Sequence, residues 1–238
     1  MRHLYPQTPI AAKLQCRSAS TVLTRCASYL CESGEYAEWE KRTNWELGVR
    51  IPLIMRVPWM PSASSGRHAR ALVEAVDIYQ TICDIMDVPL PEYDAVAFEG
   101  TSLRPVLEDP EHATVKDVAL SVFPRCAHIG MPSYGNRGSP GGQDNTCLDV
   151  ERTSFTWMGY TMRTDRYRYT EYVVWNGTTL SPVWDQVKST ELYDHEGDDG
   201  AWTDPDRFEN VNLAKTAPPT LVKQLSAQLH AAFGYPDI

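Results

Sequence analysis

The sequence predicts an α/β protein in which the end of a helix-covered sheet is followed by a small antiparallel sheet and a C-terminal helix. Three observations lead to this prediction. A nearly continuous apolar run occupies residues 49–57, a long amphipathic pattern occupies residues 69–86, and residues 157–175 are rich in aromatic and β-branched residues. These are the patterns of a buried strand, a surface helix and paired strands respectively.

The first predicted element is a strand over residues 49–57, which contains Leu53, Ile54 and Met55. An apolar run of this length suits a strand that is buried on both faces of a sheet covered by helices. Pro52 lies near the beginning of the strand, where a proline is tolerated.

A polar loop leads into this strand, and loops of this kind often carry functional sites. Lys41 lies in the loop among the acidic residues Glu35, Glu38, Glu40 and Glu46. From the residues alone, Lys41 is interpreted as a solvated lysine that pairs with Glu38 or Glu40.

The clearest helix is predicted over residues 69–86. Its apolar stripe consists of Leu72, Val76, Tyr79, Cys83 and Met86. Polar residues lie on the opposite side, which is expected to face solvent, and they are Glu74, Asp77, Gln80, Asp84 and Asp87. This is a broad apolar face at the helical period. Asp87 and Pro89 mark its end, and Cys83 is expected to be a core thiol.

The second half of the chain predicts strands and one helix. A short strand is expected over residues 117–123 and a hairpin over residues 157–175, with residues 164–166 as its turn. A final helix carries the stripe Leu221, Leu225, Leu229 and Phe233, follows Pro218 and Pro219, and ends at Gly234. Residues 93–110 are expected to be mostly connection. The Gly/Pro/Asn-rich residues 124–149 form a long loop that is either functional or disordered, and His128 within it is expected to be a surface residue.

Composition limits the class of protein. The 238 residues carry a net charge of −9, which argues against a nucleic-acid surface. No apolar run approaches the length of a membrane span, so no membrane partner is expected. Residues 1–33 differ from the rest, because they hold four basic residues and one acid, a net of +3, so the remainder carries −12. That segment fits a transit peptide, a flexible tail or residues foreign to the ancestral domain, and no secretory signal is visible in it. The compartment therefore stays open.

The six cysteines form no Cys-x-x-Cys pair, so a zinc cluster is not expected. Cys126 and Cys147 flank the long loop and are able to form a disulfide if the compartment is oxidising. The sequence does not decide between a bridge and free thiols.

Three further groups are candidates for sites. Arg163, Arg166 and Arg168 form a local basic cluster in an acidic chain. They are either an exposed strand face or contacts for an anionic, sulfated carbohydrate. Residues 195–199 (HEGDD) are either a loop for a hard cation or, as we favour, a solvated acidic turn. Asn176, Gly177 and Thr178 form an N-glycosylation sequon at a turn, which matters only if the chain is secreted.

The residues around Lys41 resemble a sulfatase motif. Residues 34–54, GEYAEWEKRTNWELGVRIPLI, are similar to the segment GEHGxWxKxTNFExxxRVPLI of the sulfatase family, most closely its iduronate-2-sulfatase-like branch. Tyr36 replaces a His and Trp45 replaces a Phe. A second match, MGYTMRTDRYRYT at residues 158–170, is similar to MGYSIRTxxYRYT. Residues 191–194 (ELYD) are similar to a strand of the family, so the resemblance implies a strand there, and residues 210–214 (NVNLA) are similar to a further short family element.

The resemblance implies a fold and a chemistry. The fold would be the C-terminal part of an alkaline-phosphatase-like sandwich followed by the small antiparallel sheet. The implied divisions are a basic, disordered segment at 1–33, the end of the α/β core at 34–125, a loop at 126–150 and the subdomain at 151–238. Lys41 would be the lysine that contacts the substrate sulfate. Intact members use a formylglycine nucleophile, made in a Cys/Ser-x-Pro-x-Arg motif, and Ca²⁺.

Parts of that chemistry have no counterpart in the 238 residues. No Cys is followed by x-Pro-x-Arg, and the positions of the metal-binding Asp and His fall on Ser28 and Tyr29. The resemblance therefore implies the C-terminal part of a sulfuric ester hydrolase with no bound cofactor and no activity alone, whose partner would be a missing N-terminal half. The alternative is a non-catalytic module that binds sulfated glycans through Lys41 and the three arginines.

Overall fold

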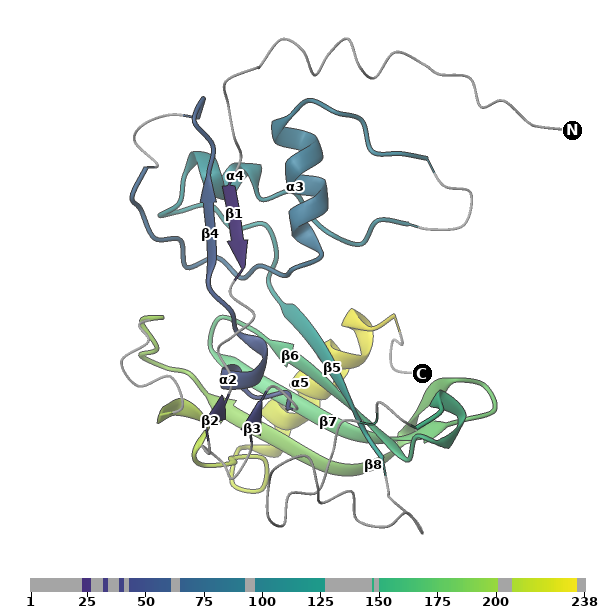
Figure 1. Cartoon of the computed structure of the whole chain (residues 1–238). Helices are drawn as coiled ribbons and strands as arrows, with labels where there is room; N and C mark the ends of the chain where they lie inside the picture. The colour runs from purple at the N-terminus through teal and green to yellow at the C-terminus, as the bar shows by residue number, and fades with distance from the viewer. Residues whose placement is uncertain are drawn as a thin grey trace, which may run out of the picture.

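The computed structural model describes residues 23–26, 32–33, 39–40, 43–60, 65–92, 97–126, 147, 150–200 and 207–234. Figure 1 shows two parts joined along the chain. The upper part contains β1 (Leu23–Cys26), β4 (Leu53–Arg56), α3 (Asp77–Ile85) and α4 (Arg104–Glu108). The lower part contains a four-stranded sheet made of β5 (Ala119–Arg125), β6 (Trp157–Arg163), β7 (Tyr167–Asn176) and β8 (Ser181–Asp194). Its other elements are β2 (Glu32–Ser33), β3 (Trp39–Glu40), α2 (Glu46–Val49), η4 (Arg152–Ser154), η5 (Arg207–Glu209) and α5 (Pro219–Ala232).

The lower sheet is antiparallel throughout, with strand order β5-β6-β7-β8. The predicted hairpin is confirmed as β6 and β7, and Thr164 closes its turn by donating its backbone N–H to the Tyr167 carbonyl at 2.8 Å. Two predicted strands are longer or shifted. β8 begins ten residues before the expected segment, and β5 ends at Arg125. The sequence placed residues 119–125 in the α/β core at 34–125. Because β5 pairs with β6, these residues belong to the antiparallel sheet instead.

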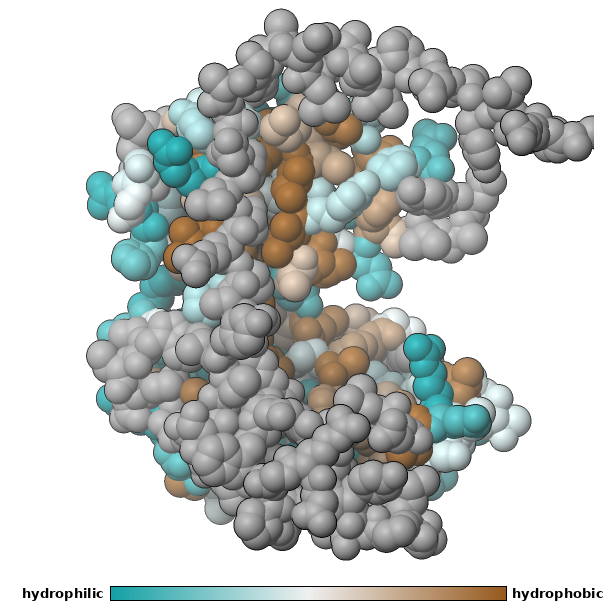
Figure 2. Space-filling model, viewed as in Figure 1, coloured by the Kyte–Doolittle hydropathy of each residue, from teal (hydrophilic) through white to brown (hydrophobic). Residues whose placement is uncertain are grey.

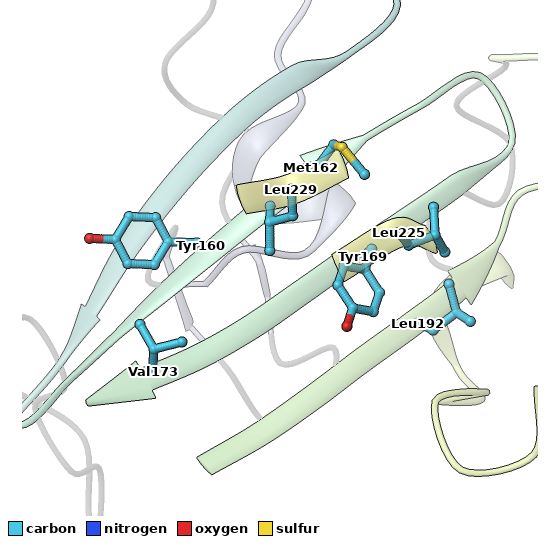
Figure 3. Packing of buried hydrophobic residues seen from close by; sticks show 7 residues of the cluster. All are labelled: Tyr160, Met162, Tyr169, Val173, Leu192, Leu225 and Leu229. Carbon is cyan, nitrogen blue, oxygen red and sulfur yellow. The ribbon is translucent and has the colours of Figure 1, made fainter. Parts of the chain in front are cut away.

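The core lies between this sheet and α5. Figure 3 shows Met162, Tyr169 and Leu192 from three neighbouring strands, directed to the same side as Leu225 and Leu229 of α5. The predicted leucine stripe of α5 is confirmed. The helix ends at Ala232 and is capped by Phe233, and Gly234 follows with a φ of 76°, the left-handed conformation that commonly closes a helix.

The strand predicted over residues 49–57 is wrong in length and in burial. Residues 46–49 form the short helix α2, in which the Arg50 N–H donates to the Glu46 carbonyl at 2.8 Å. The strand β4 is therefore limited to residues 53–56. Within the part of the chain that the structure describes, β4 pairs with β1 alone, and Ile54 is 61% exposed. A two-stranded sheet leaves alternate side chains of the strand without cover.

The helix predicted over residues 69–86 is shorter, because α3 begins at Asp77. The Glu74 N–H donates to Asp77 Oδ2 at 2.7 Å, which forms a turn before the helix instead of a helical continuation. Asp77 is fully buried, contrary to the expected solvated face. Its other oxygen accepts the Thr101 N–H at 2.8 Å and contacts Lys116 Nζ at 2.7 Å. Three donors thus compensate the buried carboxylate. The buried face of α3 also includes Thr81, Cys83 and Ile85, whereas Val76 and Tyr79 of the predicted stripe are half exposed.

Apolar residues gather on the upper part. Figure 2 shows them in brown over the region of β4 and α3, where Ile54, Val76 and Ile82 are among the exposed large apolar side chains. None of the helices in the described residues is long and apolar enough to cross a membrane.

Cys126 and Cys147 are joined by a disulfide, with their Cα atoms 5.8 Å apart. The bridging alternative is therefore confirmed in the structure. The loop between the two cysteines, with His128, lies outside the described residues, and so do residues 1–22 of the basic segment.

The packing of α5 leads to a first prediction. Leu229 is completely buried in the core, so Leu229→Ala removes its contacts and leaves a cavity. We expect the free energy of unfolding, measured by urea denaturation, to fall by about 2–5 kcal/mol. Val211 is 66% exposed, and Val211→Ala is the control, with an expected change within about 0.5 kcal/mol. Equal losses in the two variants would contradict the described core.

Candidate functional site

The two faces of the β5–β8 sheet differ in character. The face that packs on α5 is apolar. The opposite face is polar, although most of its residues are buried. It carries four cross-strand pairs: Gly159 with Tyr172, Thr161 with Thr170, Arg163 with Arg168, and Arg168 with Tyr193. A polar strand face becomes buried only where something covers it and satisfies its hydrogen bonds.

The cover over this face is the segment of residues 43–46, in front of the sheet in Figure 1. Thr43 and Asn44 are almost fully buried. The Glu46 N–H donates to Glu209 Oε2 at 2.6 Å, and Trp45 Nε1 donates to Glu191 Oε2 at 3.0 Å. Both acceptors are carboxylates of the lower part, so the segment is held by charge-assisted bonds.

Gly159 permits the close approach of this segment. A Cβ atom at Gly159 would lie 2.5 Å from Asn44 Nδ2 and 2.8 Å from a ring carbon of Tyr172. The segment therefore packs directly on the backbone of β6, which a larger residue would prevent.

Arg168 is the centre of an ion network under the segment. Its side chain is buried and bonds two carboxylates, Glu46 from α2 and Glu209 from η5, the latter at 2.5 Å from Nε to Oε1. Its Nη1 also donates to the Asn44 carbonyl at 3.2 Å. Arg163 lies beside it, with Nε 3.7 Å from Glu46 and Nη2 3.5 Å from Asp198.

His195 completes the network. Its side chain is fully buried, with Nδ1 3.0 Å from Asp198 Oδ2 and Nε2 3.1 Å from Glu209 Oε1. Both ring nitrogens thus face carboxylate oxygens. The carboxylates of Glu46, Asp198 and Glu209 therefore lie among the side chains of Arg163, Arg168 and His195.

This arrangement shifts the pKa values of its members. Burial by itself would raise the pKa of Glu46, but the guanidinium groups of Arg168 and Arg163 outweigh it and hold that pKa below its ordinary value of 4.5. Burial lowers the pKa of Arg163, and the nearby Glu46 opposes this. Burial likewise raises the pKa of Glu191, against the bond from Trp45.

Glu46, His195 and Glu209 are also spaced like metal ligands, since one ligand atom of each lies within 4.8 Å of the others. The Arg168 guanidinium, however, contacts both carboxylates and supplies the positive charge that a metal would bring. Ca²⁺ takes six to eight oxygen ligands, which these three residues do not provide. The cluster fits a buried ion network and not the Ca²⁺ site that the resemblance implies for intact sulfatases.

The structure separates the three arginines that the sequence grouped together. Arg163 and Arg168 lie in the buried network, whereas Arg166 is half exposed on the hairpin turn and pairs with Asp194 at 2.8 Å and Glu196 at 2.6 Å. Lys41 lies outside the described residues, between β3 and Thr43. Their roles in binding substrate stay predictions.

The predicted solvated acidic turn is wrong for two of its members. His195 is buried and the side chain of Asp198 is only 10% exposed, both within the network, while Glu196 is exposed as expected. Sequence reasoning also missed Glu46, Glu191 and Glu209 as members of one cluster. The available signal was that Glu46 and Arg168 belong to the two segments that resemble one family.

Arg168 provides a second prediction. Arg168→Met removes the positive charge between Glu46 and Glu209 and leaves two buried carboxylates unpaired. We expect the free energy of unfolding to fall by about 3–5 kcal/mol in urea denaturation. The matched control is Arg166→Met on the exposed turn, with an expected loss of about 0–1 kcal/mol. If both variants lost the same small amount, the network would not hold the segment.

Glu46 provides a third prediction, in the acid range. Because its pKa in the folded state lies below its unfolded value, ionised Glu46 stabilises the fold above about pH 4.5, and this contribution disappears as the pH falls through the folded pKa. The difference in stability between the wild type and Glu46→Gln should therefore shrink as the pH is lowered from 7 toward acid. Val211→Ala, at a position that is 66% exposed and carries no titratable group, is the control, and its difference from the wild type should not change with pH. A constant difference for Glu46→Gln would contradict the shift.

Comparisons with known proteins agree with this architecture. The sequence model of the family described as "N-sulphoglucosamine sulphohydrolase, C-terminal" matches residues 34–135. Iduronate 2-sulfatase of Mus musculus is 24% identical over 211 residues, which cover 73% of this chain and 36% of that protein. Arylsulfatase K of Homo sapiens is 25% identical over 211 residues, which cover 86% of this chain and 29% of that protein. The chain thus spans about a third of the length of these curated relatives.

Two solved structures share the fold. The phosphonate monoester hydrolase of Silicibacter pomeroyi has a TM-score of 0.53 at 20% identity, covering 84% of this chain and 32% of that protein. A sulfatase candidate from Bacteroides thetaiotaomicron has the same TM-score and identity, covering 90% of this chain and 36% of that protein. The predicted fold class, the end of an alkaline-phosphatase-like α/β domain with a small antiparallel sheet and a C-terminal helix, is confirmed. The chain is similar to the C-terminal region of sulfatases, with iduronate 2-sulfatase among its relatives.

Proposed function

We propose that the chain acts as the C-terminal part of an iduronate-2-sulfatase-like sulfuric ester hydrolase that cleaves sulfate from carbohydrates. One observation carries the proposal. Glu46 of the first family-like segment bonds Arg168 and lies beside Arg163 of the second, although more than a hundred residues separate the two segments. Segments that resemble one family are thus assembled into a single site, which chance similarity of either segment would not produce.

In this role the ion network positions Lys41. Thr43 and Asn44 follow Lys41 almost directly, and both are buried against the polar face of the sheet. Fixing Thr43 and Asn44 limits the positions that Lys41, two residues before Thr43, is able to take. In the proposed role the Lys41 ammonium would contact a sulfate oxygen and neutralise charge that develops there.

The remaining chemistry of the family needs other residues. Formylglycine and Ca²⁺ in intact sulfatases supply covalent catalysis and a Lewis acid at the sulfate. The 238 residues have no Cys-x-Pro-x-Arg motif, and Ser28 and Tyr29 stand at the expected metal-ligand positions. We infer that these residues alone do not turn over substrate and that activity requires an N-terminal half. The apolar surface of the upper part, with Ile54 and Ile82, is suited to pack against such a half.

The glycan-binding alternative receives less support. Each of the three arginines contacts or closely approaches at least one carboxylate, so their charges are largely compensated within the chain. Arg166 and Arg70 line an open pocket of about 300 Å³, but Glu196 and Asp199 line it too. A sulfated polymer meets no net positive surface there.

The fourth prediction concerns activity. The 238-residue chain expressed alone should not hydrolyse 4-methylumbelliferyl sulfate above the buffer rate, because it lacks the nucleophile. Protein isolated from the native source should be examined by mass spectrometry for a longer product with a Cys-x-Pro-x-Arg peptide, and that product should be active. Turnover by the short chain alone, or a longer product without activity, would contradict the proposal.

Lys41 is tested in the active longer form. Lys41→Ala should lower kcat/KM by about 10²–10³, the loss typical for one group that stabilises transition-state charge. Lys215→Ala, at an exposed position, is the control and should leave kcat/KM unchanged. Salt-sensitive retention of the short chain on heparin, abolished by Arg166→Ala, would instead favour the binding module.

A further inference from the structure

The turn between β7 and β8 begins with Asn176, Gly177 and Thr178, the only Asn-x-Ser/Thr triplet in the 238 residues. Asn176 is the last residue of β7, and Thr178, Thr179 and Leu180 are exposed. The turn therefore exposes Thr178 of the sequon to solvent, next to the half-buried Asn176 at the end of β7. This is where a modifying enzyme has access to an acceptor side chain.

The side chain of Asn176 is fixed by the turn. Its Oδ1 accepts the backbone N–H of Thr178 at 2.9 Å and that of Thr179 at 3.2 Å. This is an Asx turn, in which the side-chain oxygen takes the place of a backbone carbonyl. Among the described residues, Nδ2 has no hydrogen-bond partner, so the nitrogen that would accept a glycan is not engaged elsewhere.

Packing against the turn explains why residue 177 is a glycine. A Cβ atom there would lie 1.9 Å from the Thr153 carbonyl oxygen, because η4 packs against the turn. The middle position of the sequon must therefore be Gly. It is also not Pro, which would abolish an acceptor site.

The disulfide between Cys126 and Cys147 is an independent observation on the compartment. Disulfides form and persist in oxidising environments such as the endoplasmic reticulum and the cell exterior, and are rare in the cytosol. A sequon has meaning only in a secreted chain. The disulfide and the sequon therefore both indicate that the chain passes through a secretory compartment.

We propose that Asn176 carries an N-linked oligosaccharide and that the chain matures in an oxidising, glycosylating compartment. In the transfer, Nδ2 of Asn176 attacks C1 of the reducing sugar of a polyprenyl-diphosphate-linked oligosaccharide. The C1–N bond forms, the C1–O bond to the diphosphate breaks, Nδ2 loses a proton, and the polyprenyl diphosphate leaves. The reaction involves no oxidation or reduction at the acceptor.

A glycan at this position is compatible with the rest of the structure. Asn176 lies at the opposite end of β7 from Arg168, eight residues or roughly 27 Å away. The oligosaccharide would thus be attached far from the ion network and from residues 43–46. The proposal does not depend on sulfatase activity, and its test has no activity readout.

The test uses protein purified from its native source and digested with trypsin without reduction. We expect peptides 126–137 and 138–152 to be found linked, and peptide 169–188 to carry a glycan that peptide N-glycosidase F removes, converting Asn176 to Asp. An unmodified 169–188 peptide would overturn the proposal that Asn176 carries a glycan. Free thiols at both Cys126 and Cys147 would overturn the proposal that the chain matures in an oxidising compartment.

Two variants test the sequon in chain exported from a eukaryotic host. Thr178→Ser keeps an acceptor triplet and should retain the glycan, whereas Thr178→Ala destroys it and should lose the glycan. Thr178 is exposed, so both variants should fold, which far-UV circular dichroism checks. Glycosidase-sensitive mass that persists in Thr178→Ala would contradict the assignment to Asn176.

Discussion

The Arg168 guanidinium on β7 joins its strand to two segments that lie far from it in the sequence. It bonds Glu46 and the carbonyl of Asn44 in the first segment and Glu209 of η5 in the second. Burying a guanidinium costs desolvation free energy unless its charge and its N–H groups are all compensated. Removal of one partner leaves a buried charge without compensation. These carboxylates and this carbonyl therefore have one favourable arrangement, and it seats residues 43–46 on the sheet.

The two faces of the lower sheet consequently contribute different properties. The α5 face is packed with Met162, Leu192 and Leu229, and it stabilises the fold through burial of apolar area. The opposite face gains less from burial, because the desolvation of its charges offsets much of their attraction. What it provides is position, since hydrogen bonds to fixed partners tolerate little displacement. If Lys41 has the proposed role, the segment that follows it benefits from the second property more than from the first.

Local patterns in the sequence predicted the β6–β7 hairpin and α5, because their periodicity reflects burial against one neighbour. The same reasoning failed for Asp77, Arg168 and His195, which it placed in solvent. Each of them has a partner that lies between 14 and 124 residues away, and no local pattern records such distances. The length of α3 failed for a related reason, since the side chain of Asp77 captures the Glu74 N–H and ends the helical pattern there. The similarity of two segments to one family was the only sequence signal that connected Glu46 with Arg168.

The charge balance of the network also limits how a sulfated substrate would be recognised. The chain carries a net charge of −9, and its arginine cluster is matched by carboxylates, so long-range attraction of a polyanion is weak. Recognition in the proposed role would then depend on a few local groups, of which Lys41 is the one that this chain supplies. Local recognition is sensitive to geometry, because a displacement of about 1 Å is able to cost a hundredfold in rate. In the proposed role, loss of Arg168 would therefore reduce activity by displacing residues 43–46.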